Sequence, residues 1–245
     1  MARTPVLLLA LLLAGCGTTP APSPAPAARG EWTAPSRSVS RAPLSEPPRI
    51  TYPAVGGSEY RTAKAQPGRG GLRYRVLVET DIEGLVVDDF AATVSSTLDD
   101  PRGWSAAGRR FHRAGPGQPY DFTIYLATPR TRDVLCASAG DGYTSCRNGD
   151  KVVLNVARWA KGVPGYGASL SVYRQYMVNH EVGHRLGHGH ELCPADGEPA
   201  PVMQQQTLGL HGCTANPWPY LKGKRYAGTS GVYNDPAPGP DRGRR

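Results

Sequence analysis

Four of the six histidines in this 245-residue sequence lie within eleven residues of one another. The segment His180–His190 reads HEVGHRLGHGH and contains the pattern H-E-x-x-H-x-x-G-x-x-H without a mismatch. On a helix, His180 and His184 lie one turn apart, so both imidazoles can reach a single zinc ion at about 2.0 Å each. Gly187 can adopt the left-handed conformation that ends a helix, which lets the chain bring His190 back as a third ligand. The spacing therefore predicts one zinc ion per chain, held by three protein ligands.

Glu181 is rotated by about 100° from His180 on a helix, so its carboxylate lies beside the metal rather than on it. In that place it can act as the general base that activates a zinc-bound water for attack on a carbonyl carbon. We therefore expect zinc-dependent hydrolysis of peptide bonds at the cell envelope, with Glu181 as the catalytic residue. One alternative is a non-catalytic zinc-binding envelope lipoprotein, and another is an envelope protein that keeps zinc for folding. Neither alternative needs a carboxylate at this position.

Other side chains near the motif are weaker candidates. We expect His188 to face solvent or to support the ligands, and its replacement of His190 as a ligand is the alternative. Three side chains are candidates for stabilising an oxyanion, namely Tyr176, Tyr220 and His211. Three acids could orient a ligand imidazole, although solvated loop carboxylates are the ordinary interpretation: Glu191, Asp196 and Glu198.

Met203 follows the histidines in a segment rich in Gly and Pro. A long zinc motif followed by a Met resembles the metzincin peptidases, in which a tight turn places a Met beneath the metal. The resemblance implies a Met-turn at Met203, and the alternative is a Met that only fills a gap in the core. No Tyr lies where the astacin group has its extra ligand, so three protein ligands are assigned.

Three further segments are similar to a secreted bacterial zincin-like family known only as a domain of unknown function. They are Asp100–Trp104, the residues Arg174-Gln175-Tyr176 that lead into Asn179-His180-Glu181, and Asn216–Tyr220. The likeness covers about Leu72 to Tyr220, and it implies a metzincin-type zincin fold and peptidase activity. That family often doubles the Met of the turn, whereas this sequence has Gln204 after Met203.

The zinc motif needs a helix to hold it, and Leu170–Leu186 has the required periodicity. Tyr173, Met177, His180 and His184 follow at steps of four, three and four residues, so they lie on one helix face. We expect one further helix at Asp88–Leu98 and strands at Tyr74–Glu79, Arg109–Arg113, Tyr120–Ala127 and Lys151–Val156. Strands before an active-site helix predict an α+β fold: one zincin-like, metzincin-type domain with a mixed sheet and an irregular C-terminal part that carries the Met-turn.

Two segments have a predicted place at the edge of this sheet. Ile50–Gln66 can add a short strand at the domain edge. Lys151–Val156 precedes the active-site helix, as the substrate-aligning edge strand does in metzincins. The resemblance implies that its backbone pairs with an extended peptide or protein substrate, and an interior strand is the alternative.

The N-terminus is predicted to direct export. Val6–Leu13 is an apolar run too short to span a bilayer, and it ends in Leu-Ala-Gly-Cys, which resembles the bacterial lipobox. Cys16 would then carry lipid and anchor the protein to the outer face of the cell membrane; an extracellular protein with an ordinary cleavage site is the alternative. The predicted parts are a lipoprotein signal peptide (1–16), a Pro/Ala/Ser-rich tether (17–71), a metallopeptidase domain (72–226) and a flexible basic tail (227–245).

Four cysteines remain after Cys16, which in an exported chain predicts two disulfides. Three pairings are possible, and we favour the sequence-local one, Cys136–Cys146 with Cys193–Cys213. The net charge of +8 comes from scattered arginines, without a basic stripe interleaved with aromatic residues, so nucleic acid is not an expected partner. The charge is compatible with an anionic envelope or an acidic substrate. We expect a monomer.

Overall fold

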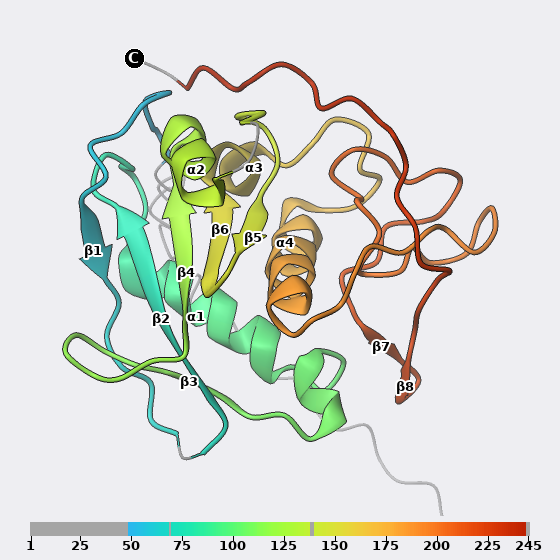
Figure 1. Cartoon of the computed structure of the whole chain (residues 1–245), viewed down its shortest axis with the longest axis horizontal. Helices are drawn as coiled ribbons and strands as arrows, with labels where there is room; N and C mark the ends of the chain where they lie inside the picture. The colour runs from blue at the N-terminus through green and yellow to red at the C-terminus, as the bar shows by residue number, and fades with distance from the viewer. Residues whose placement is uncertain (1–48, 69, 138–139, 244–245) are drawn as a thin grey trace, which may run out of the picture. The chain divides into compact units, whose positions relative to one another are not determined.

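Six strands form one mixed β-sheet: β1 Tyr60–Thr62, β2 Leu72–Glu79, β3 Phe111–Arg113, β4 Phe122–Ala127, β5 Cys146–Asn148 and β6 Lys151–Asn155 (Figure 1). The computed structural model describes residues 49–68, 70–137 and 140–243. Across the sheet the order is β1-β2-β4-β6-β5, and β3 also pairs with β2. Strands β2, β4 and β6 are parallel, whereas β1 and β5 run antiparallel to their neighbours at the two edges.

The helices of the described residues are α1 Val87–Asp99, α2 Pro129–Cys136, α3 Val156–Lys161 and α4 Leu170–Arg185, with a short 3-10 helix, η1, at Trp104–Ala107. After α4 the chain is mostly irregular and forms one small hairpin, β7 Tyr220–Leu221 with β8 Lys224–Arg225. Helices α1 and α4 pack on one face of the sheet, and α2 packs on the other (Figure 1). The fold is therefore α+β with a mixed sheet, as predicted.

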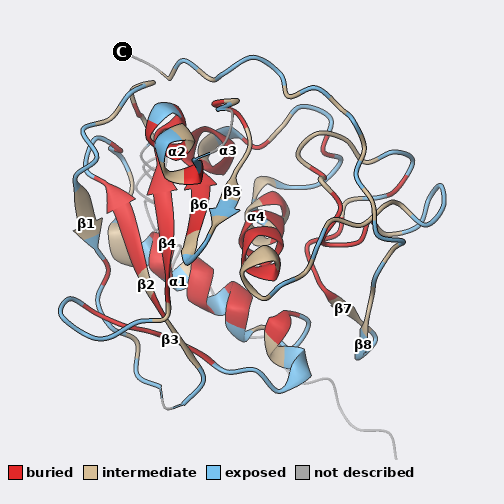
Figure 2. Cartoon of the chain, viewed as in Figure 1, coloured by how far each residue is buried: buried red, intermediate tan, exposed pale blue. Residues whose placement is uncertain are grey.

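Strands β2, β4 and β6 are buried on both faces (Figure 2). Val76, Val78 and Leu126 belong to the large core with α1 and α4, whereas Leu77 and Tyr125 pack against α2. A strand covered on both faces needs apolar side chains where it is buried, which is why residues 76–78, 124–127 and 152–154 are apolar. This central core fixes the position of α4, the helix that carries the zinc motif.

The folded part of the chain extends beyond the boundaries expected from the sequence. The short edge strand expected within Ile50–Gln66 is present as β1, which pairs with β2, although the same residues were counted in the tether; Thr51 also bridges to Glu83. At the other end, the predicted flexible tail lies against the fold, because Ser230 bridges to Glu191 and Gly243 bridges to Pro53. The pairings of this tail join residues far apart in the sequence, so its composition did not reveal them. The predicted signal peptide, Cys16 and most of the tether lie outside the described residues.

The predicted edge strand lies in the interior of the sheet. β6 pairs with β4 on one side and with β5 on the other, and the edge is formed by β5. The expectation for Lys151–Val156 was therefore wrong on two points, since the strand is not an edge and Val156 already begins α3. β5 has little β-propensity, and its register with β6 depends on the return of the chain through the turn at Gly149.

Both predicted disulfides are present. Cys136–Cys146 joins the end of α2 to β5, and Cys193–Cys213 closes the loop that contains Met203. Such bonds persist in an oxidising compartment, in agreement with an exported protein. Among the described residues, no helix has the length and apolar character needed to cross a bilayer.

Candidate metal centre

Helix α4 positions the first two histidines. Its N-terminus is capped by Ser169, whose side chain accepts a hydrogen bond from the backbone of Val172. The helix ends after Arg185, where Gly187 takes a φ of 94° and the N–H of His188 donates to the carbonyl oxygen of Gly183. A left-handed residue at this place reverses the chain, as expected from the sequence. The reversal brings the loop after α4 back toward the helix.

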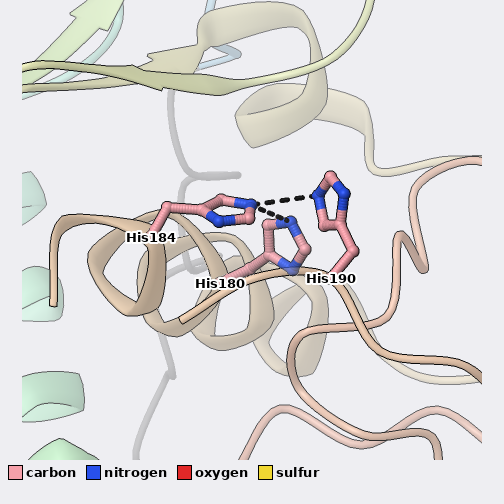
Figure 3. Close-up of side chains that lie close together, drawn as sticks. All are labelled: His180, His184 and His190. Atoms are coloured by element: carbon pink, nitrogen blue, oxygen red, sulfur yellow. Dashed lines mark hydrogen bonds between the residues drawn. The ribbon is translucent and has the colours of Figure 1, made fainter. Parts of the chain in front are cut away.

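His180, His184 and His190 point toward one another (Figure 3). The Nε2 atom of His184 lies 3.2 Å from Nε2 of His180 and 3.0 Å from Nε2 of His190. Two Zn–N bonds of about 2.05 Å at a tetrahedral angle span about 3.3 Å. The three nitrogens therefore have a spacing that fits one tetrahedral ion, with a fourth coordination position left over.

The outer nitrogens of two ligands are held by backbone carbonyl groups. Nδ1 of His180 lies 2.8 Å from the carbonyl oxygen of Val202, and Nδ1 of His184 lies 2.9 Å from that of His188. A carbonyl oxygen only accepts, so Nδ1 carries the proton in both rings and each Nε2 presents a lone pair. Lone pairs that face one another at about 3 Å repel unless a cation lies between them. The arrangement of the Nε2 atoms therefore fits a metal ion.

Burial keeps these imidazoles neutral. It lowers the pKa of His180 well below its ordinary value, with the charges of His184 and His190 adding to the effect. Burial also lowers the pKa of His184, to which the nearby charge of Arg147 contributes, and it lowers the pKa of His190 to about 4. Neutral imidazole is the form that binds a metal. Near pH 7 all three side chains are thus ready to bind.

Glu181 lies next to His180 on α4 and lines the same cleft, which has a volume of about 490 Å³. The residue is 6% exposed, and its Oε2 atom has no hydrogen-bond partner among the described residues. Burial raises the pKa of its carboxyl group to about 8, against the lowering effect of Arg132. A buried carboxyl group without a partner is costly, and a cation or a reacting water in the cleft would supply one.

Met203 is fully buried and packs against α4 at Gly183. It lies in a turn closed by a hydrogen bond of 2.9 Å from the N–H of Gln204 to the carbonyl oxygen of Pro201. A Cβ atom at Gly183 would overlap the sulfur of Met203 and the ring of Trp104, so glycine is what lets this turn approach α4. The carbonyl group that orients His180 belongs to Val202, in the same turn. The turn therefore packs against α4 and holds the ring of His180 in orientation.

The other side chains that the sequence offered as candidates lie at different positions relative to the cleft. The ring of His188 stacks on Trp104 at 4.4 Å and is not part of the histidine trio. Tyr176 lines the cleft, but its hydroxyl group donates to the carbonyl oxygen of Gln204. Tyr220, His211 and the three loop acids do not line the cleft: His211 binds Asp235, and Glu191 binds Arg225. Of these candidates, Tyr176 and His188 therefore reach the cleft, and Tyr220, His211 and the three acids do not.

The segment around β5 forms a wall of the cleft that sequence reasoning missed. Thr144, Ser145, Cys146 and Arg147 all line it. Two sequence signals lay there: the predicted disulfide at Cys146, which ties β5 to α2, and the pair Gly149-Asp150, which suits a two-residue hairpin turn. The segment is polar and short, so neither periodicity nor propensity marked it as a strand.

The segments that carry the family resemblance meet at α4. The indole Nε1 of Trp104 donates to the carbonyl oxygen of Asn179 at 2.8 Å, and Nδ2 of Asn179 donates to the carbonyl oxygen of Pro217 at 2.9 Å. Arg102 lies over the ring of Trp218 at 4.1 Å. Residues far apart in the sequence thus brace the back of the helix that carries the histidines.

A family model described as "Protein of unknown function (DUF3152)" matches residues 40–221, which is more than half of the chain. The chain belongs to this family. No curated protein and no solved structure matches it. The family description states no activity, so a function has to be inferred from the site itself.

Proposed function

We propose that this protein is a zinc-dependent peptidase of the metzincin type, exported and lipid-anchored through Cys16, that hydrolyses a peptide or protein substrate at the cell envelope. One observation carries the proposal: three Nε2 atoms converge within 4.8 Å of one another, and a buried, unpartnered carboxylate lines the same cleft. Metal capture and structural stabilisation need the first feature only, whereas hydrolysis needs both.

Each side chain has a role in this proposal. His180, His184 and His190 bind the metal through Nε2, and the carbonyl oxygens of Val202 and His188 hold two of the rings in orientation. Bound zinc supplies Lewis acidity, which polarises a carbonyl group and lowers the pKa of water to near 7. Glu181 then takes the proton from the attacking water and passes it to the leaving nitrogen. A dication nearby favours the ionised form of Glu181, which offsets the effect of burial on its pKa.

The substrate would bind along β5 in this proposal. β5 pairs with β6 on one side only, and its residues form the cleft wall beside the histidines. An extended peptide can add to such an edge through main-chain hydrogen bonds. In this proposal, Cys146–Asn148 therefore pairs with the extended substrate, which is the role that the sequence predicted for Lys151–Val156.

Two features support the metzincin type. The chain leaves α4 through Gly187 and returns with His190, and the turn that contains Met203 packs against α4 and supplies the carbonyl group of Val202 that holds His180.

The test is a cleavage assay with the full chain, a library of peptides and stoichiometric zinc, analysed by mass spectrometry. We expect defined cleaved bonds, loss of cleavage after chelation, and recovery when zinc is added back. A protein that retains about one zinc per chain but cleaves no peptide and no envelope protein would contradict the proposal. The non-catalytic zinc-binding lipoprotein would then take its place.

A further inference from the structure

Among the residues that the structure describes, Arg147 is the one permanently charged cation that lines the cleft. It lies at the centre of β5, where strand alternation turns its side chain away from the face that Cys146 uses for the disulfide to α2. Arg147 lines the same cleft as the histidine trio, and it does so from β5, the strand at the edge where a peptide would add.

Arg147 is exposed. Within the described ranges 49–68, 70–137 and 140–243 it has no ion pair and no side-chain hydrogen bond. Other polar side chains of the cleft are already engaged. The hydroxyl group of Thr144 donates to Asp141, that of Ser145 accepts from the backbone of Asn155, and that of Thr207 bonds to Tyr173. Among the described side chains of the cleft, Gln205 also has no side-chain hydrogen bond, but it is neutral, so Arg147 is the group here that offers a permanent positive charge to a ligand.

We propose that Arg147 forms a subsite for a carboxylate of the substrate, so that the cleft takes acidic peptides. The planar guanidinium group presents paired N–H donors that match the two oxygens of a carboxylate, and such charge-assisted pairs are stronger than neutral hydrogen bonds. The net charge of +8 favours the approach of an acidic chain as well. This inference rests on the proposed function for its chemistry, but its binding step can be tested separately.

The carboxylate has two sources in a peptide, namely the side chain of Asp or Glu and the C-terminus of the chain. A side-chain carboxylate would make the protein an endopeptidase selective for acidic sequences. A C-terminal carboxylate would make it act near the ends of peptides. Both sources place one negative charge against Arg147. Peptides with a free C-terminus and peptides with a C-terminal amide distinguish the two sources.

The test uses the full chain with Glu181→Gln, loaded with zinc, so that peptides bind without turnover. The probes are fluorescent Ala/Gly octapeptides with a single Glu or Gln at each position, each made with a free C-terminus and with a C-terminal amide. Binding is measured by fluorescence anisotropy. Arg147→Gln is added as the test variant, and Arg110→Gln is the control, because Arg110 is an exposed arginine that does not line the cleft.

We expect one carboxylate, from a Glu position or from the free C-terminus, to improve affinity about tenfold over its neutral counterpart. Arg147→Gln should abolish that preference, Arg110→Gln should keep it, and added salt should weaken it. Equal binding of acidic and neutral peptides, absence of binding, or a preference that survives Arg147→Gln would overturn the inference. A parallel cleavage assay with the wild-type chain reports on the proposed function alone, so selective binding without cleavage would overturn that function and leave the subsite standing.

Discussion

The hydrogen bonds at Nδ1 decide what the histidines can do. Because the carbonyl oxygens of Val202 and His188 each accept from a ring, the opposite nitrogens of His180 and His184 face inward as lone pairs. A chain that used these rings only for packing would gain nothing by turning acceptors toward one another. The arrangement is explained by a cation, and three imidazoles are ligands that zinc accepts.

His184 lies at the centre of the trio, since its Nε2 atom is the one close to both others. We expect His184→Ala to reduce bound zinc from about one per chain to a small fraction at neutral pH, because two imidazoles hold zinc poorly. Elemental analysis after dialysis measures the loss, and His112→Ala, far along the sequence on β3, is the matched control. Zinc content equal to wild type in His184→Ala would refute the ligand assignment.

The zinc-free protein should show the effect of burying Glu181. Its pKa is raised to about 8 from an ordinary value of 4.5, so between these values the folded state holds a proton that the unfolded chain has lost. The contribution of Glu181 to the free energy of unfolding therefore decreases as the pH rises from 4.5 to about 8. Since Glu181→Gln removes the effect, the zinc-free variant should gain stability over zinc-free wild type between about pH 5 and pH 8, on the order of a few kcal/mol.

Urea denaturation of both chelated proteins at several pH values measures this difference. A difference in the free energy of unfolding that stays constant with pH would show that Glu181 titrates normally in the fold. That result would remove the evidence that the carboxylate is buried without a partner.

Among the elements, the C-terminal segment (residues 227–243) has a direct connection to the third ligand. The N–H of Gly231 donates to the carbonyl oxygen of His190, and the N–H of Leu192 donates to that of Thr229. Further along, Asp241 binds Arg158. The segment lies beyond residue 221, where the family match ends. It holds in place the irregular loop that presents His190.

Deletion of residues 227–245 should therefore weaken zinc binding about tenfold or more, as expected when groups that orient a ligand are removed. The matched control is deletion of residues 237–245, which removes Asp241 but keeps the hydrogen bonds of Thr229 and Gly231. Competition with a zinc-binding dye gives both affinities. Equal zinc affinities for the two deletions would show that the segment does not position His190.

The sequence predicted the elements that have strong periodicity. Leu170–Leu186 ends one residue from α4, and Asp88–Leu98 lies within α1, because each helix buries one apolar face against the sheet. Helix α2 has a polar sequence, PRTRDVLC, and is held by packing on the far face of the sheet and by a disulfide. β5 was missed for a related reason, since only its pairing with β6 makes it a strand.

The candidate site was predictable to a similar extent. The three ligands and Glu181 follow from a short local motif, whereas Arg147 reaches the cleft only through sheet order, which a single sequence does not reveal. The same holds for the C-terminal segment, whose composition is that of a loose tail but whose backbone pairs with residues near His190.

At the scale of the whole molecule, the cleft lies where the sheet meets the irregular C-terminal part. β5 supplies one wall, and α4 supplies His180, His184 and Glu181. His190 comes from the loop after α4, and Gln205, Thr207 and Leu208 contribute from the loop that follows the turn of Met203. Two disulfides tie β5 and that loop to the fold. This construction suits an exported protein, because covalent bonds hold segments that have little regular structure.

The proposed anchoring concerns the chain as a whole and depends on Cys16. We expect the wild-type protein to fractionate with membranes and Cys16→Ser to be released or left uncleaved, since retention requires the two or more acyl chains of a lipidated cysteine. Cell fractionation followed by mass measurement of the N-terminal peptide tests this. A Cys16→Ser protein that is cleaved normally and stays equally membrane-bound would rule out the lipid anchor.

The central claim is that Glu181 performs chemistry at a metal held by three histidines. Glu181→Gln keeps the size of the side chain and leaves all three ligands in place, but it removes the base. The most direct measurement is the rate of cleavage of a verified peptide by wild type and Glu181→Gln at equal, measured zinc content. We predict that Glu181→Gln lowers the cleavage rate by about 10²-fold or more and leaves the zinc affinity unchanged. Cleavage at the wild-type rate by the zinc-loaded variant would contradict the role of Glu181 as the base.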